Sequence, residues 1–204
     1  MLDATDLSRV GRLFALLDGL LTERQTRLQG GNYTQYVAAH DVRGCPAVLL
    51  VVEDIAAFRE RTAYAYDDAL LRLAREGAAC GIYLFVTGNG FGMQDIPVRL
   101  ADALRTVLVL ELPDRARYGE TLRCRIPQGL PAEAAPGRGL TVLGGRVVEF
   151  QTALAADAPD DYARADALRR ESEALRTAWP GRPARRVPGI PAAVSYTHLT
   201  LPTI

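Results

Sequence analysis

The sequence contains no lysine, since all 24 of its basic residues are arginine. The phosphate-binding P-loop of an NTPase carries a lysine that reaches the β- and γ-phosphates, and Schiff-base enzymes also depend on a lysine. These 204 residues therefore contain neither a P-loop lysine nor a Schiff-base lysine. If the protein binds a nucleotide through a P-loop, that lysine lies outside them.

Cysteine and histidine are also scarce. The cysteines Cys45, Cys80 and Cys124 are far apart, odd in number and without C-x-x-C spacing, which argues against a disulfide framework or a zinc site and favours a reducing compartment. His40 has no partner at a metal-site spacing, so we interpret it as a surface or packing residue. The apolar runs have the length of strands, well short of the roughly 20 residues of a membrane-spanning helix.

The charges of the chain balance. The 24 basic and 24 acidic residues give a formal net charge of zero, so no net field attracts the chain to nucleic acid, a membrane surface or an acidic ligand. With 49% hydrophobic residues, a chain of this length can bury about 70% of its unfolded surface in one domain. We therefore expect a globular domain and do not expect DNA binding.

Three apolar segments alternate with helical patterns. The runs AVLLVV after Cys45-Pro46, GIYLFVT at 81–87 and TVLVLEL at 106–112 are continuous, which is typical of strands buried on both faces of a parallel sheet. An amphipathic pattern predicts a helix over 6–28 that stops at Gly30-Gly31. Helical crossovers are expected between the strands, including a short helix over 97–104, and the fold class is therefore α/β.

The second half of the chain predicts a hairpin, a helix and a linker. Gly144-Gly145 joins TVL to RVVEFQ, and adjacent glycines supply the positive φ angles of a two-residue turn. Residues 160–178 predict a charged surface helix, and the Pro/Gly/Arg-rich run after Trp179 is typical of a linker. The last eleven residues, 194–204, lack Arg and Ala and resemble translated read-through of a transposase sequencing adaptor, so we expect them to be foreign.

Polar side chains follow the first two predicted strands. Ligands of open parallel sheets bind beyond the carboxyl ends of the strands, a rule that selects Glu53-Asp54 and Thr87-Gly88-Asn89. Two carboxylates at such a place are what a Walker-B site supplies: one holds the magnesium shell and the other orients or deprotonates the attacking water. Acidic residues also commonly end strands or cap the next helix, so this pattern alone does not assign catalysis.

Four stretches in order resemble the second half of an FtsK/SpoIIIE-type ATPase module: CPAVLLVVED, REGAACGIYLFVTGN, DIPVRLADALRTVLVLEL, and PGRGL followed by EFQTAL. The last resembles the EssC/EccC branch of type VII secretion. The resemblance implies a partial RecA-like P-loop NTPase core with a mainly parallel sheet and a C-terminal β-hairpin, in an N-terminally truncated fragment whose Walker-A half is missing. It divides the chain into part of the ATPase domain (1–156), a surface helix (157–179), an interdomain linker (180–193) and the foreign tail (194–204).

The resemblance also implies catalytic roles for the two acids. Glu53 takes the place of the family's magnesium-site Asp, which holds Mg²⁺ through water, and Asp54 takes the place of a Glu that is Asn in many EssC modules. The order of the acids is thus inverted, and a carboxylate shift of one methylene, roughly 1.5 Å, can cost on the order of 100-fold in rate. We therefore expect the complete module to bind ATP and Mg²⁺ and to hydrolyse ATP slowly or not at all.

Other positions imply weaker assignments. Thr87 and Asn89 stand where the family places a polar sensor of the γ-phosphate, often Thr-Gln, and here Gly88 replaces the Gln. A β-forming Thr followed by a Gly-Asn turn is an equally good interpretation. The loop GNGFG lacks the lysine and the frame of a phosphate cradle. We interpret Arg138 in PGRGL as a surface turn residue rather than an arginine finger.

The resemblance implies a secretion ATPase module with ATP and Mg²⁺ as cofactors. Its implied partners are other ATPase modules of the same chain, a homo-oligomeric, hexameric ring and WXG-type substrates. Its implied location is the cytoplasmic side of the bacterial membrane, as a soluble module of a membrane-anchored protein.

Two alternatives remain open. A DNA translocase of the FtsK type would need cationic side chains to neutralise the DNA phosphates. The neutral net charge of the chain argues against this alternative. A non-enzymatic scaffold would bind a partner's signal peptide without nucleotide. A preceding G-x-x-x-x-G-K-[ST] motif would distinguish motor from scaffold.

Overall fold

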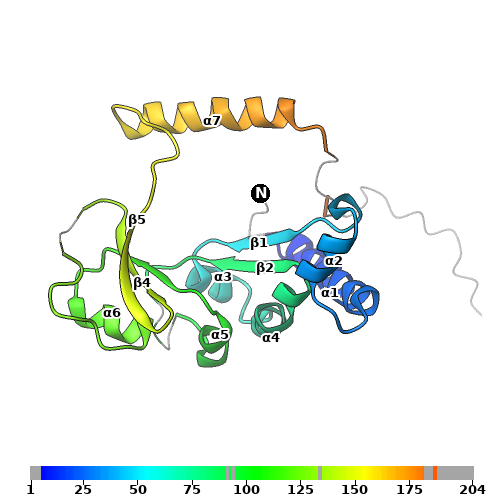
Figure 1. Cartoon of the computed structure of the whole chain (residues 1–204), viewed down its shortest axis with the longest axis horizontal. Helices are drawn as coiled ribbons and strands as arrows, with labels where there is room; N and C mark the ends of the chain where they lie inside the picture. Colours follow the sequence, from blue (N-terminus) through cyan, green and yellow to red (C-terminus); the bar gives the residue numbers. More distant parts are fainter. Residues whose placement is uncertain (1–5, 91, 93–94, 133–134, 182–185, 188–204) are drawn as a thin grey trace, which may run out of the picture.

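The structure is a computed structural model that describes residues 6–90, 92, 95–132, 135–181 and 186–187. These residues form two small sheets with helices around them (Figure 1). The adaptor-like tail, 194–204, and most of the predicted linker lie outside the described residues. No helix of the described part is both long and apolar enough to cross a membrane.

The described chain starts with a long amphipathic helix, α1 (Leu7–Leu28). Asp6 caps it, because its carboxylate accepts a hydrogen bond from the Arg9 backbone N–H at 3.0 Å. Gln29, in the left-handed conformation, ends it just before Gly30. One stripe of the helix is buried in the core: Val10, Phe14, Leu17, Leu21 and Leu28. The helix predicted over 6–28 is confirmed.

A short helix, α2 (Tyr33–Ala39), follows, for which the apolar pattern of the sequence gives no prediction. Asn32 and Gln35 form a capping box, in which each side chain accepts a hydrogen bond from the other residue's backbone N–H. Seven residues are too few to show a clear apolar stripe, so the capping box was the available signal. The buried Tyr33 hydroxyl donates to the Cys45 carbonyl at 2.9 Å, which holds α2 against the segment that leads into the first strand.

Two parallel strands form the sheet that carries the predicted site. β1 (Val48–Val52) and β2 (Ile82–Val86) pair in register from their first to their last residues. The core against this sheet comes from α1, α4 and α5, whose buried side chains surround Val52 and Ile82. Both predicted strands are therefore present, each somewhat shorter than its apolar run.

The crossover between β1 and β2 consists of short helical pieces rather than one helix. α3 (Ile55–Arg61) and α4 (Asp67–Arg72) are separated where Ala63 and Tyr64 adopt φ angles of 48° and 62°. Left-handed residues cannot continue a right-handed helix. α4 runs on into a π-helical turn, Leu73–Gly77.

Only one face of the β1–β2 sheet is covered by described residues. Val52 and Ile82 on the covered face are 6% and 1% exposed. Four side chains on the other face are between 40% and 62% exposed: Leu49, Val51, Tyr83 and Phe85. The prediction of strands buried on both faces is thus wrong for the described chain. The apolar runs indicate a sheet with two apolar faces, but the described helices supply a cover for one.

The third predicted strand lies in a different sheet. α5 (Val98–Ala103) follows β2 as predicted, but β3 (Leu108–Leu110) pairs antiparallel with β4 (Arg138–Leu143) and not with β2. Side-chain packing fixes this choice, because Val109 lies opposite Leu140 and both are buried in a second core. Apolar patterning identified the strand but could not identify its neighbour.

The antiparallel sheet ends in the predicted hairpin. β4 pairs with β5 (Arg146–Gln151) through a turn in which Gly144 and Gly145 have φ angles of 56° and 76°, so the two-residue glycine turn is confirmed. Helix α6 (Arg115–Leu122), which is absent from the elements predicted above, packs Tyr118 and Leu122 against this sheet. The α/β class with parallel strands and a C-terminal hairpin is confirmed.

The last helix, α7 (Asp161–Ala178), stands apart from both cores. None of its 18 described residues is buried, and ion pairs three or four residues apart line it, including Arg170–Asp166 and Arg176–Glu173. Figure 1 shows α7 on the opposite side of the β1–β2 sheet from α3 and α4. The charged surface helix predicted over 160–178 is confirmed.

The three free cysteines differ in access. Cys45 and Cys80 are buried and Cys124 is partly exposed; burial also raises the pKa of the Cys80 thiol, which lowers the fraction of reactive thiolate. We expect DTNB to label Cys124 first in the native protein and to label Cys45 and Cys80 only after unfolding in guanidinium. The released thionitrobenzoate measures this order. Equally fast labelling of all three cysteines in the native protein would contradict the packing described above.

Candidate functional site

Glu53 and Asp54 directly follow β1, at the carboxyl end of the parallel sheet. Glu53 is exposed and Asp54 is half-buried. Asp54 has a φ of 48°, a left-handed conformation that Asp adopts more readily than most residues. It is also the N-cap of α3, because its Oδ1 accepts a hydrogen bond from the Ala57 N–H at 3.2 Å. Asp54 therefore has the helix-capping role that acidic residues often take after a strand.

Thr87 ties the end of β2 to the end of β1. Its hydroxyl accepts a hydrogen bond from the Asp54 N–H at 3.1 Å. Its own N–H donates to the Val52 carbonyl at 3.0 Å, and its carbonyl accepts from the Ile55 N–H at 2.8 Å. These bonds hold Thr87 against the turn that carries the acidic pair. Two carboxylates and one hydroxyl thus gather at one edge of the sheet, which we call the rim.

The exposed rim side chains are accessible to a ligand. Glu53, Thr87 and Asn89 are all exposed. Within the described part of the chain, the Glu53 and Asn89 side chains make no hydrogen bond and no ion pair. The structure therefore places Asp54 and Thr87 in direct contact, Glu53 next to them, and Asn89 two residues beyond Thr87 on the loop.

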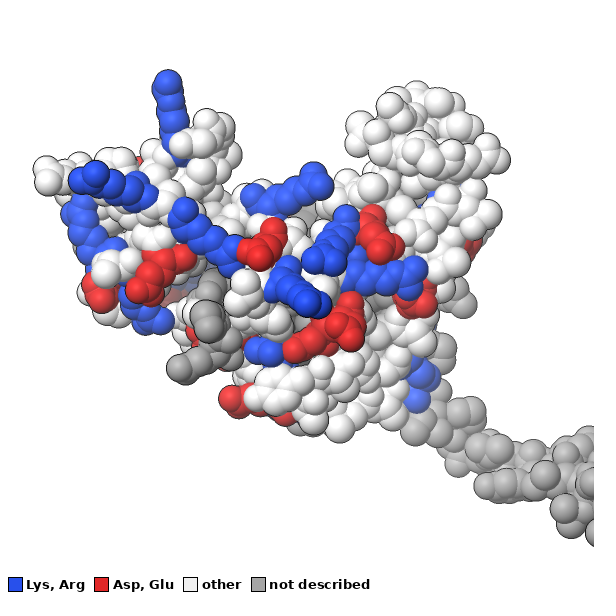
Figure 2. Space-filling model, turned by 90° about the horizontal axis from the view of Figure 1, so that it is seen from below, with Lys and Arg blue, Asp and Glu red and all other residues white. Residues whose placement is uncertain are grey.

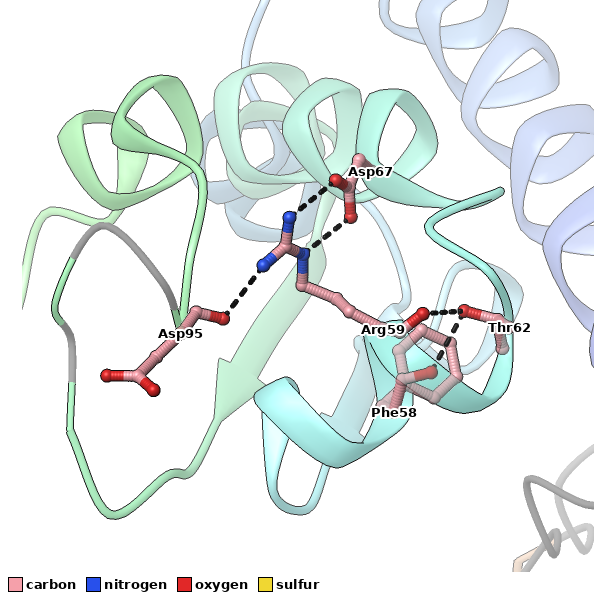
Figure 3. Close-up of polar contacts among 5 residues, drawn as sticks. All are labelled: Phe58, Arg59, Thr62, Asp67 and Asp95. Atoms are coloured by element: carbon pink, nitrogen blue, oxygen red, sulfur yellow. Dashed lines mark hydrogen bonds and ion pairs between the residues drawn. The ribbon is translucent and has the colours of Figure 1, made fainter.

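Arg59 links α3 to the loop after β2, and sequence reasoning missed it. Figure 3 shows its guanidinium between Asp67 and Asp95. Nε and Nη2 each donate to one Asp67 carboxylate oxygen at 2.9 Å, and Nη1 donates to the Asp95 carbonyl at 3.0 Å. The Arg59 side chain is 11% exposed, and its hydrogen bonds to Asp67 raise the pKa of the guanidinium.

The hydrogen bonds of Arg59 to Asp67 and Asp95 anchor the loop that begins at Thr87. The Asp95 carboxylate accepts a hydrogen bond from the Gly92 N–H at 3.1 Å, so Asp95 joins the loop's glycine to Arg59. The loop is thus tied to α3 near both ends, by Thr87 and by Asp95. No sequence signal could have shown the Arg59–Asp67 pair, because it depends on the left-handed break between α3 and α4.

The rim can contribute ligands to Mg²⁺ but cannot enclose it. No group of three or more His, Cys, Asp or Glu side chains suited to a metal occurs among the described residues. Mg²⁺ commonly takes one or two carboxylates and completes its shell with water and substrate phosphates. The hard oxygen atoms of Glu53 and Asp54 fit that donor set, so these residues suit a magnesium ion that arrives with a nucleotide.

The candidate residues outside the rim, Arg138 and His40, contact neighbouring residues of the fold. Arg138 opens β4 rather than forming a turn, with its Nε 3.4 Å from Gln151 Oε1 and 4.0 Å from Glu149. It borders a cavity of ≈ 280 Å³ that contains no rim residue. His40 stacks on Tyr36 at a centroid distance of 4.3 Å, in agreement with its interpretation as a packing residue. The loop GNGFG is only partly described.

Charges of both signs are interspersed on one face of the molecule. Figure 2 shows arginines and acidic residues next to one another on the face seen from below, without a broad field of one sign. A face with both signs of charge side by side does not steer a polyanion toward it.

The fold is similar to that of solved ATPase domains. EssC (ATPases 2 and 3) from Geobacillus thermodenitrificans overlays 94% of this chain with a TM-score of 0.77 at 20% sequence identity. EccC (ATPases 2 and 3) from Thermomonospora curvata, solved with a signal sequence peptide, overlays 91% with a TM-score of 0.67 at 22% identity. The pCW3 conjugation coupling protein TcpA, in its monomer form with ATPγS, overlays 82% with a TM-score of 0.58 at 18% identity.

This chain spans only part of each of these proteins. It covers 36% of the EssC chain, 34% of the EccC chain and 49% of the TcpA chain. No protein-family model and no curated protein sequence matches it. At these identities the comparison defines the fold: the described chain has the fold of part of an EssC/EccC ATPase domain, as the resemblance in the sequence predicts.

Proposed function

We propose that this chain is part of an ATPase module of a type VII secretion system and that its rim takes part in binding a magnesium nucleotide. The overlay with EssC over 94% of the chain supports this most strongly. The rim supports it independently, because ligands of open α/β sheets bind at the carboxyl ends of the strands.

Glu53 is the proposed contact to the magnesium shell. Its carboxylate is exposed, and a bound Mg²⁺ would neutralise negative charge on the phosphates. Asp54 is the proposed partner of the attacking water, but one of its oxygens already caps α3. Only part of its hydrogen-bonding capacity remains for that water, which adds to the inverted order of the acids as a reason for slow hydrolysis.

Thr87 and Asn89 are the proposed polar contacts to the terminal phosphate. The backbone and hydroxyl hydrogen bonds of Thr87 fix its position relative to Asp54, so it is preorganised, whereas Asn89 lies exposed on the loop. Since the chain has no lysine, the phosphate-binding loop of this module must come from a segment outside these residues.

The wider setting follows from the same proposal. The solved EssC and EccC chains are about three times as long as the part that this chain overlays and contain ATPases 2 and 3. We therefore propose other ATPase modules of one parent chain as partners, together with a homo-oligomeric ring, WXG-type substrates and a location on the cytoplasmic side of the membrane.

Nucleotide binding by the complete module tests this proposal. In a protein that joins this chain to its phosphate-binding segment, Glu53→Gln should weaken Mg²⁺-dependent binding of a fluorescent ATP analogue about tenfold, or about 1.4 kcal/mol. Binding without Mg²⁺ should not change. Turnover should be roughly 100-fold below the typical 10 s⁻¹ of enzymes.

The matched control is Glu60→Gln, an exposed glutamate on α3 that lies away from the rim in sequence. It should leave binding unchanged. Equal binding by the wild type and by Glu53→Gln at saturating Mg²⁺ would refute the role of the rim. Fast hydrolysis, at tens of turnovers per second, that Glu53→Gln abolishes would refute the degenerate chemistry.

A DNA-coupling ATPase is the second candidate, because the chain also overlays a conjugation coupling protein. The lower TM-score and the interspersed charges of Figure 2 favour the secretion module. Fluorescence anisotropy with labelled duplex DNA at 50 and 200 mM salt distinguishes the two. Affinity that falls by about 10³-fold or more over this range would support the DNA-coupling function.

A further inference from the structure

The side chain of Arg117, on α6, lies against the loop that follows β2. A Cβ atom at position 90 would lie 3.0 Å from Arg117 Nη2 and 2.8 Å from Asp95 Oδ2. Gly90 therefore leaves the space in which these two charged groups approach the backbone of the loop. Arg117 is exposed, so its guanidinium is accessible to a ligand.

The Arg117 guanidinium has unused hydrogen-bonding capacity. It makes no hydrogen bond and no ion pair with any other residue that the structure describes. The neighbouring arginines differ, because Arg115 Nη2 donates to the Pro127 carbonyl at 2.8 Å and Arg123, at the end of α6, pairs with Asp102. A guanidinium carries five N–H donors and no acceptor, so Arg117 can offer donors to an anionic ligand.

The loop places Arg117 close to the rim. A Cβ atom at position 88 would lie 3.4 Å from the Gly90 carbonyl oxygen and 3.4 Å from Ile55 Cγ2, so the loop folds back on itself next to the start of α3. The Thr87 carbonyl accepts a hydrogen bond from the Ile55 N–H at 2.8 Å, which fixes Thr87 to the same turn. Figure 1 shows α3 and α6 toward the same end of the β1–β2 sheet, away from α2.

We propose that Arg117 contacts the terminal phosphate of the nucleotide at the rim and gives the site its preference for a nucleoside triphosphate over a diphosphate. This inference rests on the proposed function, in which Thr87 and Asn89 of the adjacent loop are polar contacts to the same phosphate. Those two side chains carry no charge, and the chain has no lysine. Arg117 adds a cation whose planar fork of donors matches the oxygen atoms of a phosphate.

The alternative role of Arg117 is to anchor the loop. Arg59 already does so, because its Nη1 donates to the Asp95 carbonyl at 3.0 Å. The Asp95 carboxylate attracts Arg117, but among the described residues it accepts its hydrogen bond from the Gly92 N–H, at 3.1 Å. Arg117 thus lies next to the loop without bonding to it, which favours a role in ligand binding.

Competition between ATP and ADP tests the assignment of Arg117. Each nucleotide, with Mg²⁺, displaces a fluorescent ATP analogue from the complete module. Arg117→Met should weaken ATP binding about tenfold, because a charge-assisted hydrogen bond to the terminal phosphate is lost. ADP lacks that phosphate, so its binding should not change. Arg117→Lys keeps the positive charge and should recover part of the lost ATP affinity.

The matched control is Arg115→Met, an exposed arginine on the same helix whose guanidinium bonds to the Pro127 carbonyl. It should leave the affinities for ATP and ADP unchanged. Arg117 is exposed, so Arg117→Met and Arg117→Lys should also retain the wild-type thermal unfolding midpoint.

The ratio of the two affinities separates this inference from the proposed function. Equal weakening of ATP and ADP binding by Arg117→Met, or no weakening of either, would overturn the assignment of Arg117. The proposed function would still stand in that case if Glu53→Gln weakens Mg²⁺-dependent binding. A complete wild-type module that binds no Mg²⁺-ATP would refute both.

Discussion

Replacement of Arg24 by Met should lower the free energy of unfolding by about 3 kcal/mol, because it removes three charge-assisted hydrogen bonds to backbone carbonyls and leaves the buried Cys80 carbonyl without this donor. Arg24 is 3% exposed. Its Nη1 donates to the carbonyls of Cys80 and Gly81 at 2.9 and 3.0 Å, and its Nη2 donates to the Pro46 carbonyl at 2.5 Å. The Cys80 and Gly81 carbonyls lie directly before β2, and the Pro46 carbonyl lies two residues before β1, so one side chain of α1 holds the starts of both parallel strands.

The environment of Arg24 makes the expected loss large. No carboxylate of a described residue forms an ion pair with it, and its other neighbour is the Tyr33 ring, 5.9 Å from the guanidinium carbon to the ring centroid. Met keeps the apolar stem of the side chain but removes every donor. The loss therefore isolates the hydrogen bonds to the carbonyls rather than the packing.

Urea denaturation followed by circular dichroism measures this loss, with Arg27→Met as the matched control on the same helix. The Arg27 side chain is 39% exposed and pairs with Glu23, so its replacement should cost less than about 1 kcal/mol. A loss for Arg24→Met no larger than that of the control would show that Arg24 does not hold the strands as described.

Replacement of Arg59 by Met should lower the free energy of unfolding by about 2–3 kcal/mol, because it leaves the Asp67 carboxylate partly buried without its partner. The side chains of Arg59 and Asp67 are 11% and 27% exposed. The bidentate geometry and the third bond, to the Asp95 carbonyl, distinguish this pair from the exposed ion pairs of the chain.

The pH dependence of this contribution follows from the raised pKa of Arg59, whose largest cause is its hydrogen bonds to Asp67. A raised pKa means that the folded state holds the proton more tightly than the unfolded state. The contribution of Arg59 is therefore complete below the ordinary arginine pKa, which lies far above neutral pH, and is lost only as the pH rises through the raised pKa of the folded state. The loss in Arg59→Met should therefore be the same at pH 7 and pH 9.

A double-mutant cycle with Asp67→Asn measures the interaction energy between Arg59 and Asp67. Arg72→Met is the matched control. Arg72 is 40% exposed and its pairs with Asp18 and Glu76 are on the surface, so its loss should be small and should shrink in high salt. Additive losses for Arg59→Met and Asp67→Asn would contradict the pairing seen in Figure 3.

Local signals in the sequence predicted the elements that depend on local chemistry. Continuous apolar runs marked β1 and β2, and two adjacent glycines marked the hairpin turn. The break between α3 and α4 carried no such marker, because Ala63 and Tyr64 adopt positive φ angles that usually favour glycine. The sequence therefore predicts a helical crossover but not its division into α3 and α4.

Pairings between distant segments could not be predicted in the same way. The apolar run of β3 fits either sheet, and only its packing with Leu140 and α6 decides. Arg24 and Arg59 look like ordinary helix arginines in the sequence, since their partners lie on other segments. Strand-end geometry did place Asp54 and Thr87 at one edge, but the hydrogen bond between them and the cap on α3 required the structure.

A paramagnetic metal can report whether the rim receives the magnesium nucleotide. With Mn²⁺ in place of Mg²⁺ in the ATP complex of the complete module, NMR line broadening within this chain should be strongest at the backbone amides of Glu53, Asp54 and Thr87. Broadening whose maximum lies elsewhere in the chain, or none at saturating Mn²⁺-ATP, would contradict this account.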